Sequence, residues 1–260
     1  MAKSFDDLTI ADDFMFCKVM QDEEICKEFL EMVLVNKIGK IIYLSPQNAI
    51  VTGSESKSVR LDLLVKDDMG KSYDIEMQVA NERNIPKRMR YYQAAIDVSF
   101  LDKGAHYKTL NDCYIIFVCL FDVIGKSKPI YTFENICLED RQTSLQDGTR
   151  KVIINAEAFR KAKDKELKGF LEYVKIGTAN TEYTGRIETM IQTVKNNEQA
   201  RQEYRFMTAF EMDALDKGEA IGARQAKLET AKNLLGLGLS IENIAQATGL
   251  LVEEIENLSK

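Results

Sequence analysis

The chain has 260 residues, 45% of them hydrophobic and 29% charged, so it is long enough to bury a full hydrophobic core. Its formal net charge of −6 excludes an overall basic surface for nucleic acid, although a local basic patch is compatible with that charge. The sequence has neither an apolar run long enough for a transmembrane helix nor a signal-peptide pattern at its start, so we expect a cytoplasmic protein.

The histidine and cysteine counts narrow the chemistry further. His106 is the only histidine, which excludes most Ser-His-Asp and Cys-His arrangements unless His106 itself is the base. The five cysteines are scattered and contain no Cys-x-x-Cys pair, which argues against a cysteine-rich zinc site. We expect reduced thiols that are mostly buried.

The first predicted elements are helices. Apolar residues recur at helical spacing over residues 13–36, where Asp13 opens one helix and Asp22 is placed to cap a second. An acid at the start of a helix is favourable in itself, so Asp13 needs no further role to explain its position. Residues 39–44 are a candidate strand, and the polar residues 53–58 predict a loop.

Residues 59–79 predict two strands, 60–65 and 72–79, joined by a turn. Alternation along the second strand places Asp74, Glu76 and Gln78 on one face, with apolar residues on the other. The turn brings Asp62 beside Glu76, and two carboxylates on neighbouring strands suit a hard divalent cation. Spacing alone favours a different interpretation, a hairpin with a solvated polar face, because acids are common on exposed strand faces.

The middle of the chain predicts one helix and several strands. Pro86 favours the start of a helix over residues 87–101, whose basic residues 87–90 form a candidate local patch, while Tyr91 and Tyr92 are expected to pack in the core. The nearly continuous apolar run 112–123 predicts a central strand buried on both faces. Further strand candidates are residues 130–138 and 150–154.

From about residue 164 the pattern is helical only. Helices are predicted at 166–174 and 184–215, with glycines as breaks at 218, 222, 236 and 238. Residues 239–258 have the outline of a helix-turn-helix that begins at the cap Ser240. Its second helix carries three acids where a DNA-reading helix usually has Arg, Asn or Gln, so it is predicted to serve packing or dimerisation.

These segments resemble a known family. The order helix, strand, hairpin, helix and strand, with Asp13, Asp62, Glu76 and Gln78, resembles the PD-(D/E)XK nuclease fold. The motifs look like those of the Rpn family of recombination-promoting nucleases and transposases. They are DDFMF (12–16), VRLDLLV (59–65), YDIEMQ (73–78), PKRMRYYQAAID (86–97), YIIFVCLFDVIGK (114–126), YTFENIC (131–137) and LKGFLEYV (167–174).

The resemblance implies an α/β fold, in which a restriction-endonuclease-like core has a mixed central sheet flanked by helices and is followed by an all-helical C-terminal extension. We place the catalytic domain at residues 1–160 and the extension at residues 161–260. The implied activity is Mg²⁺-dependent endonucleolytic hydrolysis of DNA in recombination, mobile-element movement or defence, with Mn²⁺ or Ca²⁺ as alternative metals. DNA is the implied partner, the extension is expected to form a homo-oligomer such as a dimer, and no membrane association is expected.

The resemblance also assigns metal ligands. Asp62 and Glu76 would bind the ion, together with the backbone carbonyl of Met77. Asp13 would reach the ion directly or through water. A metal ion bound there would lower the pKa of a ligated water and neutralise charge on the scissile phosphate.

Gln78 stands where the wider fold usually has a lysine that positions the attacking water and stabilises the charged transition state. A glutamine can orient a water by hydrogen bonds but carries no charge. Arg88 or Arg90 could supply that charge; a phosphate contact or a surface salt bridge is the alternative role for both.

Two other functions stay open from the sequence. One is a non-catalytic DNA-binding or regulatory protein that keeps the fold, and the other is a transposase-associated factor that acts inside a larger complex. The intact set of acids argues against a degenerate, non-catalytic site.

Overall fold

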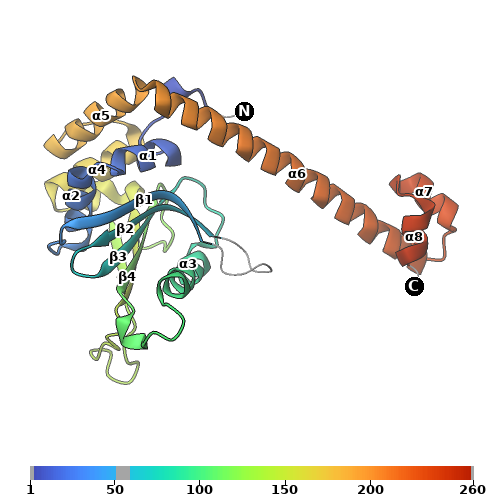
Figure 1. Cartoon of the computed structure of the whole chain (residues 1–260), viewed down its shortest axis with the longest axis horizontal. Helices are drawn as coiled ribbons and strands as arrows, with labels where there is room; N and C mark the ends of the chain where they lie inside the picture. The colour runs from blue at the N-terminus through green and yellow to red at the C-terminus, as the bar shows by residue number, and fades with distance from the viewer. Residues whose placement is uncertain (1–2, 51–58, 259–260) are drawn as a thin grey trace. The chain divides into compact units, whose positions relative to one another are not determined.

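The computed structural model describes residues 3–50 and 59–258, so the loop predicted at residues 53–58 lies outside the described part (Figure 1). The chain divides into two compact units, Lys3–Ala200 and Arg201–Lys260. The first unit thus ends at Ala200, whereas we place the end of the catalytic domain at residue 160 on the sequence.

The first unit is built on a six-stranded mixed sheet with the order β1-β2-β3-β4-β6-β5. β3 pairs in parallel with β4, and β4 in parallel with β6, while the other neighbours are antiparallel. The strands are β1 (Ile41–Ile50), β2 (Val59–Asp67), β3 (Lys71–Gln78), β4 (Asp112–Cys119), β5 (Ile130–Phe133) and β6 (Thr149–Asn155). The carboxyl ends of β3, β4 and β6 therefore meet at one edge of the sheet.

Four helices cover one face of this sheet (Figure 1). They are α1 (Asp13–Met20), α2 (Glu23–Leu34), α4 (Lys165–Ile176) and α5 (Glu182–Lys195). A run of ring contacts joins all four, because Phe16 of α1 packs on Phe29 of α2, Phe29 on Phe170 of α4, and Phe170 on Tyr183 of α5. As predicted, Asp22 caps α2 by accepting hydrogen bonds from the backbone of the first turn.

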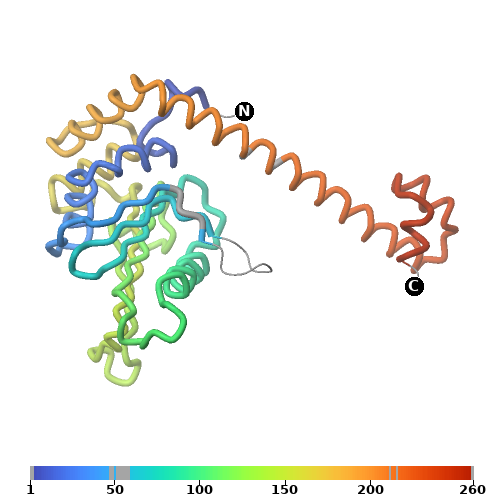
Figure 2. The backbone as a smooth tube through the Cα atoms, in the orientation of Figure 1, coloured from blue at the N-terminus to red at the C-terminus, as the bar shows by residue number. Residues whose placement is uncertain are grey.

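The opposite face carries α3 (Ile85–Phe100), which the backbone trace shows lying against the strands (Figures 1 and 2). Ile85, Met89 and Ile96 of α3 pack with Leu64, Ile115, Phe117 and Ile153 of the sheet. The central strand β4 is buried on both faces, which confirms the prediction from its apolar run. Because α3 covers this face, the polar face of the β2–β3 hairpin is buried, and the interpretation of a solvated hairpin is wrong.

Short 3-10 helices complete this unit: η1 (Phe5–Asp7), η2 (Tyr107–Thr109) and η3 (Ala156–Lys161). The cysteines are free, and all except the partly exposed Cys137 are buried, as predicted. No helix in the described ranges is long and apolar enough to cross a bilayer.

The second unit contains most of α6 (Glu198–Gly236), followed by α7 (Ile241–Thr248) and α8 (Val252–Leu258). Ala231, Ile244, Leu250 and Ile255 form its small core. Ser240 caps α7, as predicted, and the chain turns at Gly249 in the left-handed conformation. The predicted breaks at Gly218 and Gly222 are wrong, since α6 continues through both and ends at Gly236.

Candidate active site

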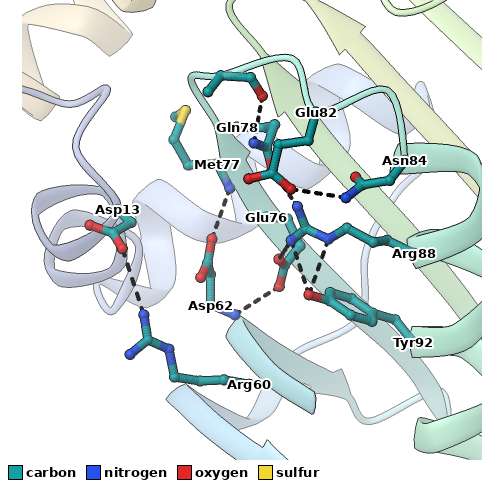
Figure 3. A network of polar contacts seen from close by, with 11 residues as sticks. Asp13, Arg60, Asp62, Glu76, Met77, Gln78, Glu82, Asn84, Arg88 and Tyr92 are labelled. Carbon is teal, nitrogen blue, oxygen red and sulfur yellow. Dashed lines mark hydrogen bonds and ion pairs between the residues drawn. The ribbon is translucent and has the colours of Figure 1, made fainter. Parts of the chain in front are cut away.

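Backbone pairing between β2 and β3 gives way to side-chain contacts where two acids meet. Regular backbone pairing extends from the pair Lys66–Ser72 to the pair Leu63–Ile75. Beyond it, the backbone N–H of Asp62 donates to Glu76 Oε1 at 2.8 Å, and the backbone N–H of Met77 donates to Asp62 Oδ2 at 3.0 Å (Figure 3). Each carboxylate thus binds the backbone of the other strand, and the two acids are fixed side by side at a fork between the strands.

Both acids at this fork have raised pKa values. Glu76 is only 1% exposed, and burial raises its pKa well above the usual range, with further increases from the charges of Asp74 and Asp62. Burial raises the pKa of Asp62 to about 6, against the lowering effect of the Met77 N–H and with a smaller increase from Asp13. The ionised pair is therefore electrostatically unfavourable in the protein alone, and a nearby cation would stabilise it.

Arg88 is the cationic side chain that reaches these acids from α3. Its guanidinium donates to Glu76 Oε2 at 3.3 Å, to Gln78 Oε1 at 2.5 Å and to the Tyr92 hydroxyl at 2.9 Å (Figure 3). It also lies over the rings of Tyr92 and Phe117, 5.3 and 5.1 Å from their centroids. Arg88 and Tyr92 are one helical turn apart, so α3 presents both on the same side.

Gln78 is held at both ends of its amide. Besides accepting from Arg88, its amide nitrogen donates to the carbonyl of Ala80 at 2.7 Å. The Gln78 side chain therefore has a fixed orientation beside Glu76.

The first helix approaches the fork through two contacts. The Cys17 thiol of α1 donates to the backbone carbonyl of Asp62 at 3.2 Å. Asp13, the first residue of α1, accepts from the Phe14 N–H at 2.7 Å and has its second oxygen 3.9 Å from the Arg60 guanidinium. The structure thus joins Asp13 to the site through Arg60 and through its effect on the pKa of Asp62.

The sequence did not single out Arg60, Asp74 or the tyrosine side chains as parts of the site. Arg60 precedes Asp62 by two residues. Because residues two apart in a strand lie on the same face, this spacing could have identified Arg60 as a neighbour of the site. Tyr92 packs on Phe117, as expected of a core residue, but its hydroxyl also binds Arg88. The prediction that Tyr91 packs in the core is wrong, because its side chain is 40% exposed beside Arg88 and Arg90 on the wall of a cavity.

Asp74 lies deeper on the same face of β3. It is wholly buried, and within the described part of the chain no backbone N–H or neutral side-chain donor reaches its carboxylate oxygens; the group that hydrogen-bonds with it is the Glu76 carboxyl. Burial raises its pKa well above the usual range, and the charge of Asp62 raises it further. The residue therefore adds to the electrostatic repulsion that Glu76 experiences.

The donor set fits a hard divalent cation that uses few protein ligands. Among residues 3–50 and 59–258, no cluster of three or more His, Cys, Asp or Glu side chains is arranged to hold a metal. A site here would rest on two carboxylates completed by backbone, water or substrate oxygens, and Mg²⁺ is commonly bound in this way. Burial is the main cause of the raised pKa values of Asp62 and Glu76, and it outweighs the lowering effect of Arg88, so a divalent ion would favour the ionised form of both acids.

Comparison with known families decides the classification. The profile of the PD-(D/E)XK nuclease family transposases matches residues 11–220, which includes every residue of the site described above. The chain belongs to this family. Membership in the PD-(D/E)XK nuclease family transposases confirms the resemblance and the α/β fold expected from the sequence, and it relates the chain to nucleases that act on DNA. Comparisons with curated proteins and with solved structures found no match.

Proposed function

We propose that this protein is a metal-dependent DNA endonuclease, with Mg²⁺ as the preferred ion and Mn²⁺ or Ca²⁺ as alternatives. The observation that carries the proposal is the fork at which Asp62 and Glu76 bind each other's strands and hold two carboxylates side by side. Family membership supports the reaction class, since it relates the chain to nucleases. The family is described as transposases, and movement of mobile DNA requires strand cutting.

In this proposal Asp62 and Glu76 would hold the ion, with the carbonyl of Met77 as a further ligand, and Asp13 would reach it directly or through water. When bound, the ion would act as a Lewis acid and lower the pKa of a ligated water. The chain's own contribution is to fix the ligands: the backbone N–H groups of Asp62 and Met77 orient the two carboxylates.

Arg88 supplies the positive charge that Gln78 does not carry. Its guanidinium lies at the carboxylate of Glu76 and also fixes the Gln78 amide, so it can donate to a phosphate oxygen held at the fork. Arg90 lines the neighbouring cavity, and in this proposal it binds a phosphate next to the scissile one. Gln78, oriented by Arg88 and Ala80, uses its remaining N–H to position water.

The test is nicking of supercoiled plasmid by purified protein with Mg²⁺ or Mn²⁺, beside Asp62→Asn and Glu76→Gln. Both variants keep the size of the side chain and remove its charge, so we expect a loss of at least about 100-fold in rate. Asp102→Asn, an exposed acid beyond α3, is the matched control and should nick like the wild type.

Two outcomes would count against this proposal. Equal nicking by the wild type and both site variants would contradict the site assignment and point to a contaminating nuclease. If the wild type binds DNA but cuts it with neither metal, the protein is a non-catalytic DNA-binding or transposase-associated member of the family.

A further inference from the structure

A cavity of about 640 Å³ adjoins the proposed active site, between the start of β2 and the exposed side of α3. Four cationic side chains line it, Arg60, Lys87, Arg88 and Arg90, together with the rings of Tyr91 and Tyr92. Glu82 is its one acidic wall residue among those described, and that carboxylate accepts from the Asn84 amide at 2.9 Å. Cavities of roughly 300–1,000 Å³ hold compact organic ligands, and this one combines positive charge with aromatic surface.

Two of the cavity's side chains also belong to the proposed active site. Arg88 lies 3.3 Å from Glu76, and Arg60 lies 3.9 Å from Asp13. Figure 3 shows these two arginines on either side of the Asp62–Glu76 pair. A DNA strand with a phosphate at that pair therefore has an adjoining nucleotide at the mouth of the cavity.

The aromatic lining indicates which part of that nucleotide enters. Tyr91 is 40% exposed at the cavity wall, and the hydroxyl of Tyr92 is bound by Arg88, which fixes the second ring. Phosphates need only the cations, whereas a base gains from stacking on an aromatic face. A paired base inside a duplex stack cannot enter a cavity, so only an unpaired or extruded base can use these rings.

We propose that this cavity binds one unpaired nucleotide next to the scissile phosphate, which makes single-stranded or locally unpaired DNA the preferred substrate. The inference rests on the proposed function for the position of the scissile phosphate. Lys87 and Arg90 bind the phosphates of that nucleotide, and Tyr91 stacks on its base.

The test is binding of a fluorescein-labelled single strand, a blunt duplex of the same sequence and the duplex with one central mismatch, measured by fluorescence anisotropy in EDTA so that cutting does not occur. The wild type should bind the single strand at least about tenfold more tightly than the duplex, with the mismatched duplex in between. Tyr91→Ala should lose about tenfold for the single strand and little for the duplex, in keeping with the stacking energy of one base. Tyr91→Phe, which keeps the ring, should bind like the wild type.

Tyr107→Ala is the matched control, because that tyrosine is 79% exposed on η2 and does not line the cavity. A strand that contains 2-aminopurine adds a direct readout, since stacking on Tyr91 should quench its fluorescence and Tyr91→Ala should restore it. Circular dichroism establishes that each variant is folded.

Equal affinity for the single strand and the duplex, or an equal loss on both with Tyr91→Ala, overturns the inference. The outcome is separable from that of the nuclease proposal. Plasmid nicking without a single-strand preference leaves the endonuclease standing and removes the cavity's role. A Tyr91-dependent preference without nicking keeps the nucleotide cavity and removes the nuclease.

Discussion

Asp74 lies opposite Leu64 on one neighbouring strand and Ile115 on the other. It is wholly buried, and among the described residues its hydrogen-bonding neighbour is the Glu76 carboxyl and not an N–H group. Burial raises its pKa, so the folded protein favours the protonated, neutral form. The contribution of the neutral Asp74 to the free energy of unfolding is fully present below the pKa that Asp74 has in the unfolded chain. It is lost as the pH rises through the raised pKa of the folded protein.

Replacing Asp74 with Asn should therefore stabilise the protein at high pH. In EDTA we expect the free energy of unfolding to rise by about 1–3 kcal/mol at pH 8, the range found for unsatisfied buried polar groups. At pH 5 the gain should be smaller, because the wild-type carboxyl is then closer to neutral. Urea unfolding at both pH values measures the difference, and Asp102→Asn should show no comparable change. A loss of stability at pH 8 would show that Asp74 has a partner or role that its surroundings do not reveal.

Arg88 and Arg90 are two residues apart but have different surroundings, which allows a matched comparison. Arg88→Met removes the guanidinium from Glu76 and Gln78, and we expect the rate of plasmid nicking at saturating protein to fall about 100-fold. Arg90→Met should weaken DNA binding and leave that saturated rate within a few-fold of the wild type. Arg88→Lys should recover part of the loss, since it restores charge without the planar fork. Similar defects in both methionine variants would mean that Arg88 serves DNA binding alone.

At the scale of elements, local sequence predicted most strands and helices but not what covers them. The run of apolar residues in β4 and the acids of β3 could be identified from alternation, because each strand imposes its own period. Burial of Glu76 and Asp74 could not, since it depends on α3 packing over that face of the sheet. For the same reason Arg88 was a candidate on the sequence, while its contacts with Gln78 and Glu76 were not predictable.

Glycine shows a second limit of local reasoning. Gly218 and Gly222 lie inside α6, where each is less favourable than alanine by roughly 1 kcal/mol, yet the helix continues. Gly236 ends it and Gly238 takes a positive φ, because there the chain must turn into α7. Composition alone does not separate these two pairs of glycines.

The fork between β2 and β3 also predicts how a metal should affect stability. The hydrogen bonds at the fork hold the two carboxylates together only in the folded chain. An ion bound by Asp62 and Glu76 would therefore stabilise the folded state, so Mg²⁺ or Mn²⁺ should raise the Tm. At 100 times its Kd the ion would add about 2.7 kcal/mol. Asp62 has a pKa of about 6, so at pH 5 protons compete with the ion and the increase in Tm should be smaller than at pH 8. Thermal unfolding with and without the ion measures this, and Asp62→Asn should abolish the increase at both pH values.

At the scale of the whole molecule, the packing of the first unit decides where the chain can be divided. Phe170 of α4 and Tyr183 of α5 belong to the ring contacts that include Phe29, and the Tyr183 hydroxyl donates to the carbonyl of Ile25 at 3.0 Å. A chain that ends at residue 160 would lose both rings and expose the surface beneath them. A chain that ends at Ala200 keeps this core and is the suitable reference for the role of the C-terminal helices.

Those helices should make the protein a dimer. Phe206 and Phe210 lie one turn apart on α6 and are 78% and 74% exposed, and Ile221 further along is also exposed. Apolar side chains aligned in this way favour cover by another helix, and a second copy of α6 supplies it. Acids exceed bases in the middle of α6, where Asp213, Asp216 and Glu219 accompany Lys217, and bases exceed acids in its later part, where Arg224, Lys227 and Lys232 accompany Glu229. Antiparallel pairing that brings these two parts together would match opposite net charges.

Light scattering with size-exclusion chromatography should therefore give a dimer for the full chain and a monomer for the chain that ends at Ala200. Replacing Phe206 and Phe210 together with Ser should shift the full chain towards monomer, while the exposed Thr230→Ser serves as a control on the same helix. Because charge matching contributes to the pairing, dissociation should increase with salt. A monomeric full chain would remove the role in self-association that both the sequence and the exposed face of α6 assign to this helix, and would leave its phenylalanines to be covered by a different partner.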